Sequence, residues 1–212
     1  MKLLAIHSNI LFFGQAPNFY EWLAGEREMI EKYKPLREKY NQEKVKGPLL
    51  LKDTYERVVG GLSLEQLKQY CQQYYQEYFK EEAIRKLSQI MRKVLVLVFS
   101  SYPRELYEIV KDKGLVHKVF GVEGSIGTDG KIVSITELRL EHERAVQEKM
   151  KEIGLSDKFT LKPNRFGMLE YLIDEMIENN LAKDDVTVVG GGDTAKPMYK
   201  VAVRVIENLS EI

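Results

Sequence analysis

The sequence has almost none of the residues from which disulfide frameworks and zinc sites are built. Among its 212 residues there is one cysteine, Cys71, and there are three histidines. A single cysteine excludes an internal disulfide framework and a cysteine-based zinc site. The fold must therefore be stabilised by a hydrophobic core, and a chain of this length can bury one without cross-links.

An excess of charge of one sign is also missing. The 32 lysines and arginines balance the 32 aspartates and glutamates, and no basic block stands out along the chain. Nucleic acids and anionic membranes are bound through a surplus of basic residues, so we expect neither a nucleic-acid nor a membrane partner. With 44% hydrophobic and 30% charged residues, the composition is that of a globular protein.

Long hydrophobic runs are absent as well. The apolar residues 3–6 are followed at once by His7, Ser8 and Asn9, and no Ala-x-Ala cleavage site comes after them. This beginning lacks the features of a secretory signal peptide. We therefore expect a soluble, cytoplasmic protein.

Helical patterns fill residues 17–92. The clearest helix begins at Ser63, which can cap it, and Gln66 stands at the reciprocal position of a capping box. Apolar residues then recur at alternating spacings of three and four, which places them on one helical face. These residues are Leu64, Leu67, Cys71, Tyr74 and Tyr78.

Strand patterns begin at residue 94. Residues 94–99 form a β-branched and apolar run that is typical of a central parallel strand. Further on, Thr128-Asp129-Gly130 predicts a hairpin turn between residues 126 and 135. The other predicted elements are helices over 104–113, 140–153 and 165–179, and strands over 116–122, 186–189 and 203–206.

Strands that alternate with helices predict an α/β fold with an open, mostly parallel, Rossmann-like sheet flanked by helices. The helical block after the first strand is then an insertion. We predict a core formed by residues 1–14 and 91–212, and a helical cap formed by residues 15–90.

Ligands of such sheets bind beyond the carboxyl ends of the strands. We therefore expect functional residues in the loops 7–11, 100–103 and 190–197, and at the helix start near Asn164-Arg165.

Four stretches follow the first strand in an order that covers nearly the whole chain. They are Gly61-Leu62-Ser63-Leu64-Glu65-Gln66-Leu67, Val98-Phe99-Ser100-Ser101-Tyr102-Pro103-Arg104-Glu105-Leu106, the hairpin Gly124 to Ile132, and Val188-Val189-Gly190-Gly191-Gly192-Asp193-Thr194-Ala195-Lys196-Pro197-Met198. In this order the sequence resembles the haloacid dehalogenase-like (HAD) superfamily of phosphatases, and most of all its phosphoserine phosphatase-like branch. The resemblance implies a HAD-like core with a cap inserted after the first strand.

The resemblance also shows where the chain departs from the family. In the family, the first strand ends in Asp-x-Asp-x-Thr/Val, whose first aspartate attacks phosphorus and whose second is the general acid/base. Here His7, Asn9 and Leu11 occupy those positions. The two acids of the last motif fall on Gly191 and Ala195. The nucleophile, the acid/base and the magnesium-ligand aspartates are therefore replaced.

An anion could still be bound by the groups that remain. By resemblance, Ser100 is the second-motif hydroxyl that holds phosphate, and Arg165 matches the third-motif lysine, with Lys162 as the second choice. An arginine side chain offers a rigid fork of donors to phosphate or carboxylate. The predicted anion-binding set is Ser100, Ser101, Arg165, His7, Asn9 and Gly191.

Two functions remain open. The first is a pseudoenzyme, a HAD-like protein that binds a small phosphorylated or anionic ligand, or regulates, without catalysis. The alternative is a divergent, metal-independent phosphatase with His7 as nucleophile; a carboxylate that orients His7 would favour it. We expect no cofactor and no magnesium, because magnesium prefers carboxylate ligands; Asp193 is the one alternative metal ligand. A homo-oligomer through the tyrosine-rich cap helices is a further expectation.

Overall fold

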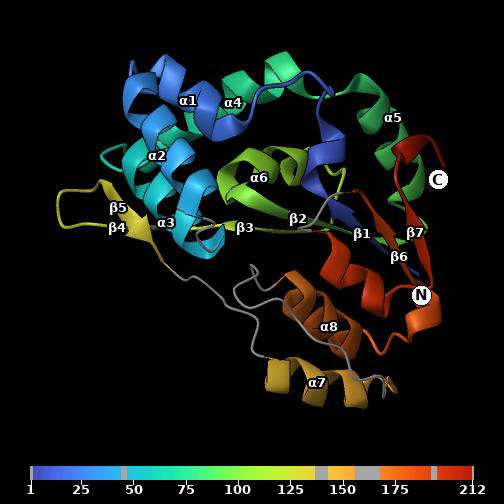
Figure 1. Cartoon of the computed structure of the whole chain (residues 1–212). Helices are drawn as coiled ribbons and strands as arrows, with labels where there is room; N and C mark the ends of the chain where they lie inside the picture. The colour runs from blue at the N-terminus through green and yellow to red at the C-terminus, as the bar shows by residue number, and fades with distance from the viewer. Residues whose placement is uncertain (1, 44–46, 137–142, 156–167, 192–194, 212) are drawn as a thin grey trace.

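The computed structural model describes residues 2–43, 47–136, 143–155, 168–191 and 195–211. Its centre is a five-stranded sheet in the order β3-β2-β1-β6-β7, in which every neighbouring pair is parallel (Figure 1). The strands are β1 (Leu3–His7), β2 (Leu95–Pro103), β3 (Lys118–Val122), β6 (Val186–Val189) and β7 (Arg204–Ile206). The predicted α/β fold with an open parallel sheet is therefore confirmed.

The central strand β1 is buried along its whole length because both faces of the sheet are covered. Successive side chains of a strand point to opposite faces. Accordingly, Leu4 and Ile6 belong to one hydrophobic cluster, and Leu3 and Ala5 belong to a second one on the other side. The first cluster includes residues of α6 (Arg104–Asp112), and the second includes residues of α7 (Glu143–Glu152) and α8 (Met168–Glu178).

The insertion between β1 and β2 is helical, as predicted. It contains α1 (Phe19–Glu26), α2 (Ile30–Glu43), α3 (Gly47–Val58), α4 (Leu64–Tyr78) and α5 (Glu81–Ile90). The capping box of α4 is formed: the Ser63 hydroxyl accepts from the Gln66 N–H at 3.2 Å, and the Gln66 side chain accepts from the Ser63 N–H at 2.9 Å. Leu67, Cys71 and Tyr74 are buried as expected, whereas Leu64 is 39% exposed. The division into a cap of 15–90 and a core stays a prediction.

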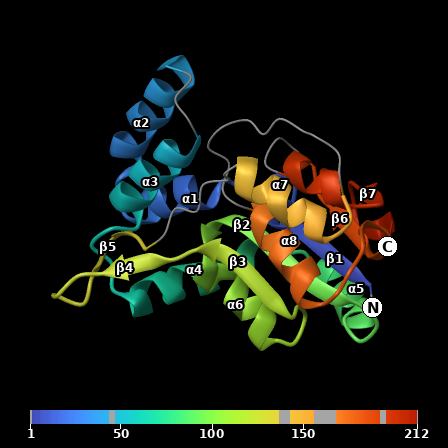
Figure 2. The same ribbon diagram turned by 90° about the horizontal axis from the view of Figure 1, so that it is seen from below.

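The predicted hairpin is also present. Strands β4 (Gly124–Ile126) and β5 (Ile132–Ile135) are antiparallel, and Gly130 in the turn has a φ of +75° that favours glycine. The hairpin is joined to the insertion, because Ile132 exchanges backbone hydrogen bonds of 2.8 Å with Gly61 and Leu62. Figure 2 shows it projecting on the side of the molecule where α2 and α3 lie.

Strand β2 is longer than the sequence pattern predicted. We expected it to end at Phe99 and to be followed by a loop at Ser100–Pro103, but the strand continues to Pro103. The reason is its neighbour: after a shift of register, β3 still pairs with β2, with Val122 opposite Pro103. Pairing thus extends the strand through polar residues whose local pattern signals a turn.

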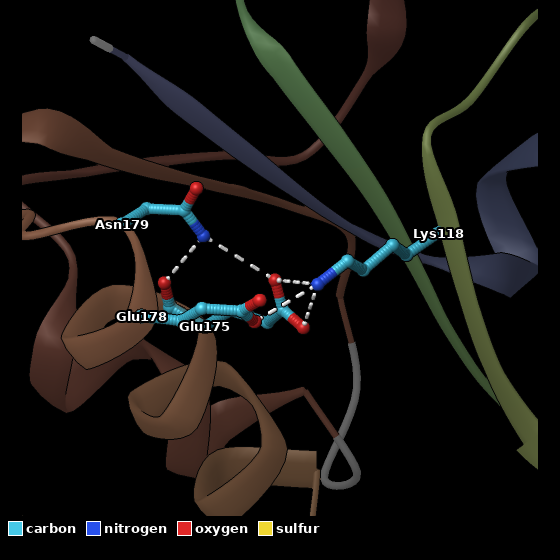
Figure 3. Close-up of polar contacts among 4 residues, drawn as sticks. All are labelled: Lys118, Glu175, Glu178 and Asn179. Carbon is cyan, nitrogen blue, oxygen red and sulfur yellow. Dashed lines mark hydrogen bonds and ion pairs between the residues drawn. The ribbon is translucent and has the colours of Figure 1, made fainter.

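A polar cluster ties α8 to the amino end of β3 (Figure 3). The Lys118 ammonium group lies 2.8 Å from a carboxylate oxygen of Glu175 and 2.9 Å from one of Glu178. Asn179 donates to the Glu175 carbonyl at 2.8 Å. These carboxylates raise the pKa of Lys118, and the Glu175 side chain is buried. Because β3 begins at Lys118, this cluster lies at the amino end of the strand, and the predicted ligand loops lie at the opposite end of the sheet. The cluster therefore has a structural role.

None of the helices in the described part of the chain is both long enough and apolar enough to span a membrane.

Candidate functional site

The carboxyl ends of β1, β2 and β6 bring three of the predicted loops together. His7 ends β1 opposite Phe99 of β2, and Gly190 follows the last residue of β6. A Cβ placed on Gly190 would lie 2.7 Å from the Cβ of His7, and the φ of Gly190 is +125°. Only glycine tolerates both conditions. The backbone of the glycine loop can therefore lie directly against His7 at this position. The Gly190 carbonyl accepts a 2.6 Å hydrogen bond from the Tyr199 hydroxyl.

The His7 side chain is buried and uncharged at neutral pH. It is 3% exposed, and this burial lowers its pKa from 6.5 to about 4, although a side-chain hydrogen bond with Asn9 opposes the shift. Burial disfavours the charged imidazolium because an apolar surrounding solvates it poorly. Asn9 itself lies at the surface. The carboxyl end of β1 thus carries a neutral, weakly basic ring.

Two serine hydroxyls meet beside His7. Ser8 begins the short 3-10 helix η1 (Ser8–Leu11), and its Oγ donates to the Ser100 Oγ at 2.9 Å. The Tyr102 N–H donates to the same Ser100 oxygen at 2.9 Å, which leaves the Ser100 proton free to be donated. Both serines are buried. The Ser100 hydroxyl is thus oriented by two donors, which fixes the direction in which its own proton can point.

Tyr107 lies beneath this serine pair and is fully buried. Burial raises its pKa well above the usual value, and the hydroxyls of Ser100 and Ser8 lower it in part. The Tyr107 hydroxyl therefore stays neutral. It lies close to the hydroxyls of Ser8 and Ser100, although it makes no hydrogen bond of good geometry with them.

Tyr20 of α1 covers the end of β2, a contact that the sequence analysis missed. Its hydroxyl donates to the Ser101 carbonyl at 2.8 Å. The rings of Phe19 and Tyr20 pack against the Tyr102 ring, with centroid distances of 5.8 and 5.6 Å. The helical insertion thus contacts the predicted anion-binding segment directly. The only sign of this contact in the sequence is the aromatic pair Phe19-Tyr20 at the start of α1, and the pair alone does not indicate which segment it packs against.

The last loop is only partly described. A Cβ on Gly191 would meet no atom of the described residues within 4 Å. Ala195 is fully buried in the second hydrophobic cluster, so an acid at this position would be enclosed by apolar side chains. Gly192 and Asp193 lie outside the described residues, and so do Lys162, Asn164 and Arg165. Of the predicted set, the structure places His7, Asn9, Ser100, Ser101 and Gly191 at these strand ends.

The donors described at this site do not fit magnesium. They are an imidazole, an amide and hydroxyl groups, whereas magnesium prefers octahedral oxygen sites built on one or two carboxylates. Within the part of the chain that the structure describes, no group of three His, Cys, Asp or Glu side chains could hold a metal ion.

Comparison of the sequence with protein-family models and with curated proteins gives no match. Solved structures do match. A HAD family hydrolase from Salmonella enterica serovar Typhi has a TM-score of 0.66 and 14% identity, with 94% of this chain and 60% of that chain covered. A substrate-bound phosphoserine phosphatase has a TM-score of 0.63 and 18% identity, with 99% and 89% covered.

A probable phosphoserine phosphatase from Vibrio cholerae has a TM-score of 0.69 and 12% identity, with 96% of this chain and 55% of that chain covered. The chain therefore spans little more than half the length of the Salmonella and Vibrio proteins, but most of the length of the substrate-bound phosphatase. Together with the strand order and the helical insertion, these matches show that the chain has the haloacid dehalogenase-like fold in the form found in phosphoserine phosphatases.

Proposed function

We propose that this chain binds a small phosphorylated or anionic ligand at the carboxyl ends of β1, β2 and β6 and does not cleave it. The observation that carries the proposal is the state of His7, which is buried, has a pKa of about 4 and is hydrogen-bonded by the side chain of Asn9. By resemblance, His7 occupies the position of the family's nucleophilic aspartate, but the neutral imidazole does not carry the negative charge of that aspartate.

The absence of cleavage follows from what an aspartyl-phosphate reaction needs. The nucleophile has to be a carboxylate, and a metal ion has to neutralise the charge that develops on the phosphoryl group. His7 is a weak base with this pKa, and the Asn9 amide cannot deliver a proton to a leaving alkoxide. The replaced aspartates and the poor fit to magnesium support a site that works without metal.

Binding of an anion is supported by the donors at the same place. Ser100 can donate its hydroxyl proton, and no described residue fills the space that a Cβ of Gly191 would face. A buried neutral His7 has a further effect: a bound anion would favour its protonated form, because an opposite charge nearby raises a histidine pKa. Ligand binding is then coupled to proton uptake by His7.

The test is a titration with inorganic phosphate in which the ring protons of His7 are followed by NMR. We expect the His7 pKa to rise from about 4 toward its usual value of 6.5 when phosphate is present. Ser100→Ala should weaken phosphate binding about tenfold, the loss expected for one hydrogen bond to a charged group. A His7 pKa that is the same with and without phosphate would contradict the binding proposal.

Catalysis is tested separately with a generic aryl phosphate, with and without magnesium, using the wild type and His7→Ala. We expect no turnover from either protein. Turnover by the wild type that is lost in His7→Ala would overturn the non-catalytic proposal and establish the alternative, a metal-independent phosphatase with His7 as nucleophile.

A further inference from the structure

The peptide group between Ser101 and Tyr102 is held by hydrogen bonds at both of its polar ends. Its carbonyl is that of Ser101, which accepts from the Tyr20 hydroxyl at 2.8 Å. Its N–H is that of Tyr102, which donates to the Ser100 oxygen at 2.9 Å. Because a peptide group is planar and rigid, it connects a side chain of the helical insertion directly with a hydroxyl at the proposed anion site.

Regular sheet pairing does not set the orientation of this peptide group. Strand β1 pairs with β2 as far as Phe99, and the register between β2 and β3 shifts between Phe99 and Pro103. The peptide group lies within this interval, where β2 departs from the regular ladder. Its orientation therefore depends on the contact that α1 supplies.

Tyr20 is a permanent and well-anchored donor for this contact. Its side chain is buried, and burial raises the pKa of its hydroxyl well above the usual value, so the hydroxyl keeps its proton at neutral pH. The Asn18 side chain caps α1 by accepting from the Tyr20 N–H at 3.0 Å. The Tyr20 ring also packs on the ring of Tyr102, with a centroid distance of 5.6 Å. The donor is thus fixed by its own helix and by the residue that makes the next hydrogen bond.

The two hydrogen bonds of this peptide group strengthen each other. A donor on a carbonyl polarises the peptide group and makes its N–H a better donor. The Ser100 oxygen accepts from this N–H and also from the Ser8 hydroxyl at 2.9 Å. Both of its lone pairs are then used, so the Ser100 proton points away from these donors and is itself polarised. The effect of Tyr20 therefore extends to the proton that Ser100 offers to an anion.

We propose that Tyr20 is a positioning residue of the anion site, which acts on Ser100 through the Ser101–Tyr102 peptide group. The inference rests on the function proposed above, because it requires that Ser100 binds the anion. It makes the affinity of the site depend on the docking of α1. Such coupling is reciprocal, so a bound anion should also strengthen the contact between α1 and β2.

The test is a titration with inorganic phosphate, followed by amide chemical shifts, for the wild type and Tyr20→Phe. Removal of the donor should raise the phosphate dissociation constant about threefold, which is a part of the loss expected for Ser100→Ala. The Tyr102 amide proton should move upfield even without phosphate, because its hydrogen bond is weakened.

Tyr75→Phe is the matched control, because the Tyr75 hydroxyl is buried and has no hydrogen-bond partner among the described residues. This variant should bind phosphate as the wild type does and should leave the Tyr102 amide shift unchanged. Circular dichroism checks that each variant is folded.

A double variant distinguishes positioning of Ser100 from a general loosening of the site. If Tyr20 acts through Ser100, Tyr20→Phe has no further effect once the Ser100 hydroxyl is gone. The double variant Tyr20→Phe/Ser100→Ala should then bind phosphate about tenfold more weakly than the wild type, as Ser100→Ala alone does. Independent effects would give a loss of about thirtyfold.

Three outcomes would overturn this inference and leave the proposed function intact. They are equal phosphate affinity of Tyr20→Phe and the wild type, an unchanged Tyr102 amide shift in Tyr20→Phe, and a thirtyfold loss in the double variant. A wild type that does not bind phosphate would instead overturn the proposed function, and this inference with it.

Discussion

The Cβ atom that Gly190 lacks would lie 2.7 Å from the Cβ of His7. This relationship joins the end of β6 to the end of β1 and leaves no room for a side chain at position 190. It also explains why the first glycine of the triplet is needed, whereas a Cβ on Gly191 would meet none of the described residues within 4 Å.

Replacement of this glycine should therefore be costly. Gly190→Ala should lower the free energy of unfolding by about 3 kcal/mol, because a φ of +125° is strained for alanine and its methyl group collides with His7. Urea unfolding followed by circular dichroism measures this change. Gly191→Ala is the matched control and should stay within about 0.5 kcal/mol of the wild type. Equal effects of the two substitutions would contradict this account.

The low pKa of His7 predicts a stability that depends on pH. The unfolded chain takes up a proton on this histidine near pH 6.5, but the folded chain does so only near its pKa of about 4. The unfolded state thus binds more protons between these values, so stability is full above pH 6.5 and falls as the pH drops to 4. The loss that His7 contributes is about 3 kcal/mol.

His7→Gln isolates this contribution. The free energy of unfolding, measured in urea at several pH values, should fall by about 3 kcal/mol less in the variant than in the wild type between pH 6.5 and 4. Parallel curves for the two proteins would show that His7 is not buried in its neutral form.

The hydrogen bond from Tyr20 to Ser101 should stabilise the contact between the insertion and β2. Tyr20→Phe keeps the ring and removes the donor, so it should cost about 1 kcal/mol and increase amide hydrogen exchange in residues 100–103. Tyr75→Phe is the control, because the buried Tyr75 hydroxyl has no hydrogen-bond partner among the described residues. It should be neutral or slightly stabilising, and a loss as large as that of Tyr20→Phe would count against the specific contact.

The contribution of the ion pair between Lys118 and Glu175 to stability can be tested by removing the lysine and leaving the buried Glu175 unpaired. Lys118→Met should destabilise the fold by about 1–2 kcal/mol, because Glu175 is left buried without a counter-charge. The cost stays below that of a fully buried pair since the Lys118 side chain is 43% exposed. Thermal and urea unfolding measure the change.

The double variant Lys118→Met/Glu175→Leu should recover most of this stability, since no uncompensated charge remains. Glu178→Gln should have little effect because Glu178 is 64% exposed. A double variant as unstable as Lys118→Met alone would contradict the explanation.

The sequence predicted those features that depend on neighbouring residues. The capping box at Ser63, the turn at Gly130 and the apolar strands each follow from patterns within a few residues, and the structure confirms them. The order of strands and helices was sufficient to predict the parallel sheet and the place where its loops meet.

Other features depend on residues that are far apart in the chain. Tyr20 bonds to a residue 81 positions away, and Lys118 pairs with one 57 positions away. No local pattern connects such partners. The extension of β2 to Pro103 was missed for the same reason, because its pairing with β3 overrides a local turn signal. The state of His7 likewise required the burial that the assembled sheet produces.

The position of β1 in the sheet has a consequence for how the protein is made. Leu3 pairs with Leu95 on one side and with Val186 on the other, so β1 has neighbours that are synthesised much later. Such distant pairing slows folding and leaves apolar strand surface exposed until the partners arrive. Strand β1 must therefore wait for β6, and premature release or truncation before β6 would leave β1 as a site of aggregation.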